Sequence, residues 1–197
     1  MNIKESIKKF WHFLKQDTWS SWLVSLIILA VIIKLIFFPL ISFTTGTQLP
    51  LVIVESCSMY HSDNFNSWWD ANKEWYENKG ITKEQFMKFP LKNGLNKGDI
   101  LLVWGRGTYN IGDVIIFQST SQNPVIHRLV SIGPFATKGD HNSAQLTPAN
   151  NPYGIDETNI NQKQIIGKAT VKIVPYLGWV KLIWFEPFKD PKERGFC

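Results

Sequence analysis

The feature that most limits how this chain can fold is a long apolar run near its N-terminus. From Trp22 to Phe43 almost every residue is apolar, and Lys34 is the only charged one. A bilayer core of about 30 Å needs roughly 20 such residues in a helix, so we predict a transmembrane helix over residues 21–43. Lys34 lies in the distal part, where its long side chain can reach the interface. A cleaved secretory signal is the alternative, but the apolar part of such signals is only about 7–15 residues long.

The charges on either side of this run predict its orientation. Lys4, Lys8, Lys9 and Lys15 precede it, and the next lysine after it is Lys73. The positive-inside rule therefore puts residues 1–20 in the cytoplasm and everything after Gly46 outside, as a single-pass protein of the cell membrane. Within residues 3–14 the apolar side chains recur at helical spacing among the lysines, which predicts an amphipathic helix on the membrane surface.

Composition excludes several classes of function. The length of 197 residues allows one domain besides the anchor. The net charge of +5 is modest and has no basic-aromatic block, so we expect no nucleic-acid partner. Cys57 and Cys197 are the only cysteines, and neither a disulfide framework nor a zinc site is predicted from them. We therefore expect no metal and no cofactor, and for Cys57 a packing role.

The part after the anchor has the pattern of a β-domain. Gly98-Asp99 and Gly112-Asp113 are turn dipeptides, and each precedes an apolar run, at residues 100–104 and 114–117. Further strand-like runs lie at 51–54, 125–132 and 165–174. We predict a mainly β fold, an antiparallel barrel-like domain over residues 47–185. One or two short helices are expected in an insertion at about 61–93, and residues 186–197 are expected to be a loose, charged tail.

Two serines end the first predicted strand. Side chains alternate along a strand, so Ser56 and Ser58 would share one face and Cys57 would point the other way. A serine becomes a nucleophile only when a base takes its proton, and His127, on a predicted strand, is a suitable base. The third Gly-Asp pair leads into a polar loop, where Asp140 could orient that base. The structural alternative is that the serines and Asp140 only form turns and His127 is a buried core residue.

Five segments together resemble a known family. They are Glu55-Ser-Cys-Ser-Met59, Gly98-Asp99 before an apolar strand, Val125-Ile-His-Arg-Leu-Val130, Lys138-Gly-Asp-His-Asn142 and Ile166-Gly-Lys-Ala169. In this order they resemble the boxes of type I signal peptidases. The match is to the archaeal and endoplasmic-reticulum branch, where a histidine replaces the lysine base of the bacterial enzymes. The resemblance covers the chain from about Leu23 to Val180, and its boxes are specific only in combination.

The resemblance implies a membrane-anchored serine endopeptidase that cleaves signal peptides from translocated preproteins after small residues. By the matching motifs, Ser58 is the nucleophile, His127 the general base and Asp140 the orienting carboxylate. The Ser58 backbone N–H and the Ser56 hydroxyl form the oxyanion hole. The family binds its substrate as an added strand. Signal peptides and membrane lipid are the implied partners, and the translocation machinery is left open as a further one.

The chain departs from the family pattern in three places. Cys57 stands where glycine or another small residue is usual, the 61–93 insertion is longer than in many members, and the loop 143–164 is expanded. The second acidic residue of archaeal members is displaced, and Asp156 is our candidate for it. The sequence therefore leaves open which carboxylate orients His127.

Two other functions fit parts of the pattern. A membrane-tethered β-domain could bind extracytoplasmic peptides or partners without catalysis. A membrane-bound autoprotease of the repressor-cleaving type shares a related core, but it would cut an Ala-Gly or similar bond in an exposed linker, which this chain lacks.

Overall fold

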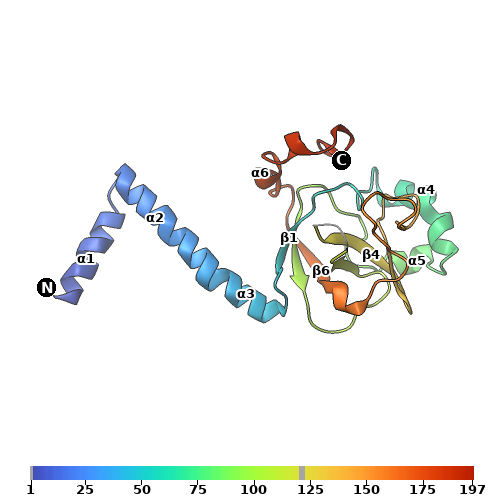
Figure 1. Ribbon diagram of the computed structural model, residues 1–197, viewed down its shortest axis with the longest axis horizontal. Coiled ribbons are helices and arrows are strands. Elements are labelled where there is room, and N and C mark those ends of the chain that lie inside the picture. The colour runs from blue at the N-terminus through green and yellow to red at the C-terminus, as the bar shows by residue number, and fades with distance from the viewer. Residues whose placement is uncertain (1, 120–122) are drawn as a thin grey trace. The chain divides into compact units, whose positions relative to one another are not determined.

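A computed structural model describes residues 2–119 and 123–197 of the chain (Figure 1). The chain divides into two compact units, the first ending at Thr44 and the second beginning at Thr45. The boundary falls at the end of the predicted membrane segment. Each unit is described separately below.

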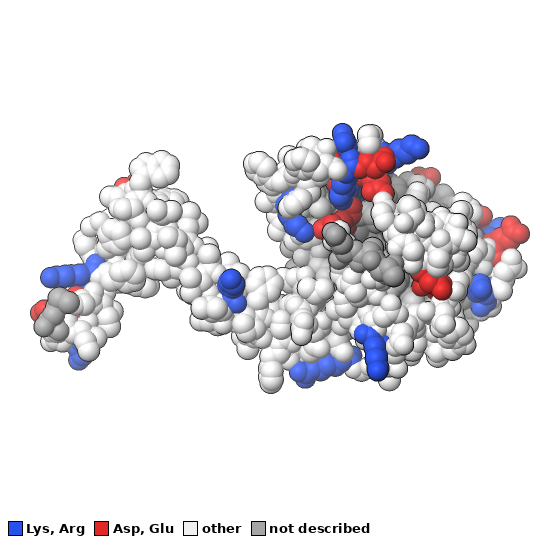
Figure 2. All heavy atoms as spheres, in the orientation of Figure 1, with Lys and Arg blue, Asp and Glu red and all other residues white. Residues whose placement is uncertain are grey.

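The first unit is helical. Helix α1 spans Ile3–Leu14. After a short break, α2 (Trp19–Ile32), the π-helical turn η1 (Ile33–Phe37) and α3 (Phe38–Thr45) follow without interruption. Together they make one helix of 27 residues, in which an 18-residue stretch has a mean hydropathy of 2.9, long and apolar enough to cross a membrane. Its surface carries almost no charge (Figure 2). The predicted helix over 21–43 is thus present and two residues longer at each end.

The π-helical turn has a local cause in the sequence. Pro39 lies two residues after it, and proline has no N–H to donate and crowds the carbonyl four residues earlier. In η1 the Phe38 N–H reaches back five residues to the Ile33 carbonyl, which widens the helix just before the proline.

Six strands form one antiparallel sheet, curled into a half-barrel, in the order β1-β2-β6-β3-β4-β5. The strands are β1 (Leu51–Ile53), β2 (Ile100–Trp104), β3 (Val114–Phe117), β4 (Val125–Ile132), β5 (Phe135–Lys138) and β6 (Ile165–Val174). A short 3-10 turn, η2 (Gln162–Gln164), leads into β6. The predicted antiparallel sheet is confirmed, but helices hold 36% of the residues and strands 18%, so the chain is mixed rather than mainly β.

The two Gly-Asp turns start strands in the same way. Asp99 accepts a hydrogen bond from the Asn96 backbone N–H at 2.8 Å, and Asp113 accepts one from Asn110 at 3.0 Å. Each glycine has a positive φ, 91° and 98°, which a side chain would disfavour. Each aspartate also pairs with a lysine of β6, the central strand beside both turns. These local turns explain why β2 and β3 begin where the sequence predicts.

The core lies on both faces of the sheet. On β3, Val114 and Ile116 pack into one cluster with Met59 and Leu101, and the alternate residues of β3 pack into a second cluster. All four side chains of β3 are buried. A strand with both faces covered is expected to be continuously apolar, as this one is.

The 61–93 insertion forms two helices that belong to the core. Helix α4 (Phe65–Glu77) is capped by Asn64 and α5 (Lys83–Phe86) by Thr82. Between them Gly80 takes a positive φ of 74°. The buried face of the insertion consists of Trp68, Trp69, Tyr76, Ile81 and Phe86, and it packs with Val130 of β4 and Ala136 of β5. The predicted helices are confirmed, and they cover the β4–β5 end of the sheet (Figure 1).

The C-terminal segment lies at the other end of the sheet. Helix α6 (Trp179–Leu182) is followed by the 3-10 turns η3 (Glu186–Phe188) and η4 (Pro191–Glu193). Gly178 approaches both Ile53 of β1 and the Gly98 carbonyl. Residues 186–197 are held by a disulfide and by the buried Lys97. The expectation of a loose tail is therefore wrong, because its contacts are with residues far away in the sequence.

Candidate active site

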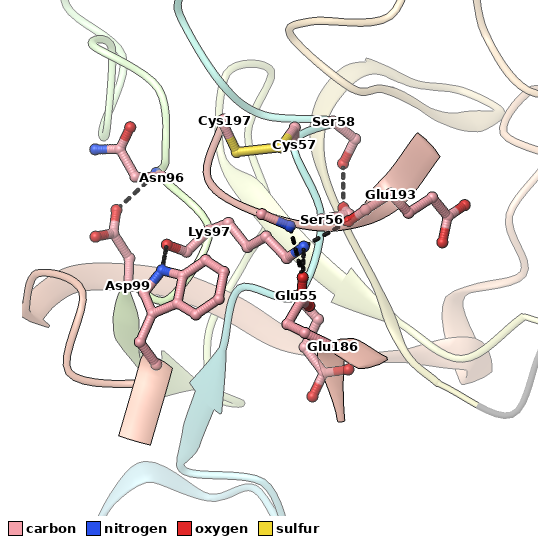
Figure 3. Close-up of a disulfide and its surroundings, with 12 residues drawn as sticks. Glu55, Ser56, Cys57, Ser58, Asn96, Lys97, Asp99, Glu186, Glu193 and Cys197 are labelled. Atoms are coloured by element: carbon pink, nitrogen blue, oxygen red, sulfur yellow. Dashed lines mark hydrogen bonds and ion pairs between the residues drawn. A yellow bond between two sulfur atoms is a disulfide. The ribbon is translucent and has the colours of Figure 1, made fainter. Parts of the chain in front are cut away.

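Ser56 and Ser58 lie in a turn directly after the edge strand β1. The two hydroxyl oxygens are 3.1 Å apart and share a hydrogen bond, as expected for side chains on one face (Figure 3). The Tyr60 N–H closes the turn on the Cys57 carbonyl, and the buried Met59 anchors it in the core. Both hydroxyls remain in an exposed setting, so a polypeptide can reach them.

Cys57 points away from the two serines and forms a disulfide with Cys197 (Figure 3). The packing role expected for Cys57 is therefore wrong. The Cα atoms are 5.5 Å apart although 140 residues separate the two cysteines, so no local pattern could predict the pairing. A sulfur held in a disulfide is no thiolate, which also leaves the serines as the nucleophiles of this segment.

His127 is buried on β4, and a carboxylate holds its ring. Its Nδ1 is 2.5 Å from Oε1 of Glu157, which is fully buried. Glu157 is fixed in turn, because the Thr137 hydroxyl donates to Oε1 at 2.9 Å and the Leu146 N–H to Oε2 at 2.7 Å. An ionised Glu157 requires the proton of a neutral imidazole to be on Nδ1, which leaves Nε2 free to act as a base.

The two carboxylates that the sequence proposes for His127 lie elsewhere. Asp156 is exposed, and its carboxylate accepts hydrogen bonds from the backbone and hydroxyl of Thr158. The prediction of Asp156 as a second carboxylate is therefore off by one residue. The neighbouring Glu157 points inward because its backbone pairs with Thr137 and Leu146 in a strand-like way.

Asp140 is the centre of a different buried cluster. Arg128 binds both of its oxygens, with the shortest contact at 2.7 Å, and His61 and Tyr76 donate to it at 3.0 and 2.9 Å. The predicted contact between Asp140 and His127 is therefore wrong. His127 and Arg128 are consecutive on β4, so their side chains point to opposite faces of the sheet. Arg128 therefore pairs with Asp140, and His127 pairs with Glu157.

Charge and burial set the protonation of this cluster. Burial alone would raise the pKa of Asp140, but the Arg128 charge and the hydrogen bonds from His61 and Arg128 hold that pKa well below its usual range. Burial lowers the pKa of His61, and its bond to Asp140 only partly opposes this. His61 is therefore neutral at pH 7 and donates from Nε2, while its buried Nδ1 has no partner among the described residues.

Gly139 brings the serine segment and the histidine together. A Cβ at this position would lie 2.8 Å from the Ser58 carbonyl oxygen and 2.9 Å from Nε2 of His127. The same loop donates a 2.8 Å hydrogen bond from the His141 N–H to the Ser58 carbonyl. Ser58 and His127, which the sequence proposes as a pair, thus meet across a glycine that no other residue could replace without displacing one of them.

Two groups at this meeting point are unpaired. Among the described residues, neither the Ser58 backbone N–H nor Nε2 of His127 takes part in a hydrogen bond. The Ser58 hydroxyl bonds to Ser56 and not to the imidazole. A free N–H and a free imidazole nitrogen are the groups that an acyl-transfer reaction uses.

Lys138 is a buried residue beside the site that sequence reasoning did not select. Its Nζ donates to the Gly139 carbonyl at 3.1 Å and lies over the rings of Trp75 and Tyr76 in α4. Burial lowers its pKa to about 8, against the pull of the carboxylates of Asp140 and Glu157. Its position directly before Gly139-Asp140 is the only sequence signal that could have pointed to it.

An open cavity of about 660 Å³ adjoins this loop. It lies between α4 and residues 141–143, and its lining includes Ser62, Trp68, Trp75 and His141. Among the described residues no group of three or more His, Cys, Asp or Glu side chains could hold a metal ion.

No protein-family model matches the chain, and no curated protein is similar enough in sequence to count as a relative. Any statement about its activity therefore depends on the residues and their geometry.

Proposed function

We propose that this protein is a membrane-anchored serine endopeptidase that cleaves signal peptides from translocated preproteins after small residues. The observation that carries the proposal is the arrangement of His127, whose Nδ1 is held by Glu157 while Nε2 faces the segment of Ser58 across Gly139. This is the set of groups that a serine protease needs, with glutamate as the orienting carboxylate.

In the proposed mechanism, His127 activates Ser58. The hydroxyl of Ser58 turns from Ser56 toward Nε2 and attacks the peptide carbonyl as its proton passes to the imidazole. Glu157 stabilises the imidazolium that forms and keeps the ring in position. The same proton then goes to the leaving amine, and water releases the acyl group by the reverse sequence.

The oxyanion is stabilised by two donors on the serine segment. These are the Ser58 backbone N–H, which is unpaired in the described structure, and the Ser56 hydroxyl, 3.1 Å from the Ser58 hydroxyl. Donors placed at the developing charge contribute about 10²–10³ in rate each. Strand β1 lies at the edge of the sheet, so an extended substrate can pair beside it and continue toward Ser58.

The membrane orientation follows from three observations. The helix of 27 residues is long enough to act as an anchor, and the lysines before it favour a cytoplasmic N-terminus. A disulfide in the second unit favours an oxidising compartment for the sheet. The catalytic unit would then work outside the cytoplasm, where signal peptides emerge.

A second function is favoured by one contact. Because the Ser58 hydroxyl bonds to Ser56 rather than to His127, a membrane-tethered domain that binds extracytoplasmic peptides without cutting them is the alternative. In that case the edge of β1 would hold a peptide while the serines served only the turn.

Cleavage of a model preprotein by the full-length protein in detergent tests the proposal. We expect a cut after the small residues that end the signal peptide, with Ser58→Ala and His127→Ala both inactive and correctly folded. Ser62→Ala, an exposed serine four residues further along, is the matched control and should keep full activity. Binding of the preprotein without any cut would support the alternative. Full activity of Ser58→Ala or of His127→Ala would exclude a catalytic role for the residue replaced.

A further inference from the structure

Residues 186–197, called the C-terminal strap below, lie against the serine segment. Cys197 of the strap is bonded to Cys57, between the two serines (Figure 3). Lys189 of the strap donates to the backbone carbonyl of Glu55 at 2.9 Å. The strap thus holds the serine segment from the side opposite to the hydroxyls.

The strap itself is anchored in the domain by a buried lysine. Lys97 is 1% exposed, and its Nζ donates to Oε2 of Glu186 at 2.8 Å and to the Glu193 carbonyl at 2.6 Å (Figure 3). The same Glu186 oxygen accepts from the Gly195 N–H at 2.8 Å. Phe196 packs against Trp179 with the two rings tilted and their centroids 4.3 Å apart. The strap is therefore a fixed support and not a mobile end.

Other restraints on residues 55–57 are few. The β1 ladder ends at Ile53, and the last backbone bonds to the neighbouring loop are those of Val54 with Gly98 and Asp99. Among the described residues, every bond from 55–57 that leaves the turn 54–60 goes to Lys181, Lys189 or Cys197. The position of Ser56 hence depends on the C-terminal segment, whereas Ser58 is also held by the His141 N–H and by the buried Met59 next to it.

We propose that the disulfide-closed strap positions the Ser56–Ser58 segment for catalysis, so that reduction of Cys57–Cys197 lowers turnover. The proposal rests on the proposed function, because it assigns Cys57, Cys197 and Lys189 as positioning residues of that site. Neither cysteine is fully buried, so a small reductant can reach the bond. The strap then couples activity to the redox state of the compartment.

The chemical step is a thiol–disulfide exchange with a small dithiol. One thiolate of the dithiol attacks a sulfur of Cys57–Cys197, the protein S–S bond breaks, and a mixed disulfide forms. The second thiol of the reagent displaces the protein sulfur. Two electrons pass to the protein, which gains two thiols, and the dithiol becomes its cyclic disulfide.

Full-length protein in detergent, with and without dithiothreitol, provides the test. We expect reduction to lower kcat by about 10- to 100-fold with little change in KM, because a displaced Ser56 hydroxyl stabilises the transition state less without changing substrate binding. Cys197→Ser should match the reduced protein and should not respond to dithiothreitol. Both are assayed well below their melting temperatures, so that a loss of stability alone leaves kcat unchanged. Unchanged or increased kcat after complete reduction would overturn the proposal.

Two lysines that both contact Glu55 form a matched pair of variants. Lys189→Met removes the bond to the Glu55 backbone and an ion pair with Glu186 inside the strap. It should lower kcat roughly 2- to 10-fold, the range of one lost hydrogen bond, because only the bond to Glu55 reaches the serine segment. Lys181→Met removes an exposed ion pair with the Glu55 side chain, 3.0 Å long, and a contact with the Phe185 ring, and should stay within about 2-fold. Equal effects of the two variants would argue against positioning through the backbone.

Hydrogen exchange separates this proposal from the proposed function. Reduction should speed exchange at the amides of residues 55–58 and leave those of β3 and β6 protected. If the oxidised protein cleaves no preprotein, the proposed function fails, and hydrogen exchange alone then tests whether the strap holds residues 55–58. Faster exchange at these amides after reduction would support that role of the strap. Unchanged exchange would refute it.

Discussion

The carboxylate of Glu157 lies 2.5 Å from Nδ1 of His127, although thirty residues separate the two in the chain. Glu157 comes from a long loop, but its backbone pairs with Thr137 and Leu146, so the loop is fixed where it meets the histidine. The position of the Glu157 carboxylate beside His127 is thus fixed by the backbone pairing of Glu157 with Thr137 and Leu146.

Glu157→Gln should be the most damaging carboxylate change for activity. The amide cannot stabilise the imidazolium and favours the wrong tautomer, so we expect kcat to fall by about 10³–10⁴-fold with the fold intact. Steady-state cleavage of a preprotein measures this. Asp156→Asn changes the exposed neighbour and should behave as the unmodified protein. The opposite ranking, with Asp156→Asn inactive and Glu157→Gln active, would show that the carboxylates have been assigned wrongly.

Gly139→Ala should separate Ser58 from His127. The added methyl would lie 2.8 Å from the Ser58 carbonyl and 2.9 Å from Nε2 of His127, closer than real contacts allow. We expect at least about 10²-fold lower activity, since a shift of roughly 1 Å is enough for such a loss. Gly133→Ala is the control, because its Cβ would meet nothing within 4 Å. Normal activity of Gly139→Ala would mean that the two residues do not need this approach.

Asp140→Asn should affect stability more than chemistry. Removing one partner of a buried pair costs about 3–5 kcal/mol, and Arg128 would lose its counter-ion. The pKa of Asp140 is lowered in the folded protein, so its stabilisation is complete above the unfolded value of about 4 and is lost as pH falls below it. Denaturant unfolding from pH 7 to pH 2 should show the gap between the two proteins shrinking below about pH 4. A constant gap would contradict this.

Lys138→Met should remove a rise in stability at alkaline pH. The pKa of Lys138 is about 8 in the folded protein against 10.5 unfolded, so the unfolded chain binds more protons between these values. Stability of the unmodified protein should therefore increase over this window, by on the order of 1–3 kcal/mol relative to the variant. Thermal unfolding at pH 7, 9 and 10.5 measures the difference. Lys163→Met, at an exposed lysine, should leave the rise in place.

The sheet could be predicted from sequence wherever a strand has a local signal. Gly98-Asp99 and Gly112-Asp113 form turns from their own side chains, so β2 and β3 begin at the predicted residues. β5 follows β4 through a two-residue turn at Gly133-Pro134, but its four residues hold only one strongly apolar side chain, Phe135. The turn has a local signal, whereas the strand itself has none and forms because it pairs with β4.

The site divides in the same way. Ser58 and His127 can be proposed from the sequence because they lie in or next to strands with clear patterns. Asp140 was given the wrong partner, since the sequence cannot tell which of two carboxylates meets His127 and which meets Arg128. Ile155 and Glu157 are both buried at a spacing of two in an otherwise polar loop, and this alternation was the one available signal for Glu157.

The disulfide also has a mechanical consequence. It makes a covalent ring of residues 57–197, which contains five of the six described strands and leaves β1 outside it, between the ring and the N-terminal apolar helix in the chain. Tension along this helix is then resisted by the backbone bonds of Thr45 and Pro50 to Gly105 and Val103, and by the three-residue pairing of β1 with β2. Ser58 lies inside the ring, so a pull on the helix would separate β1 from β2 before it moved this serine.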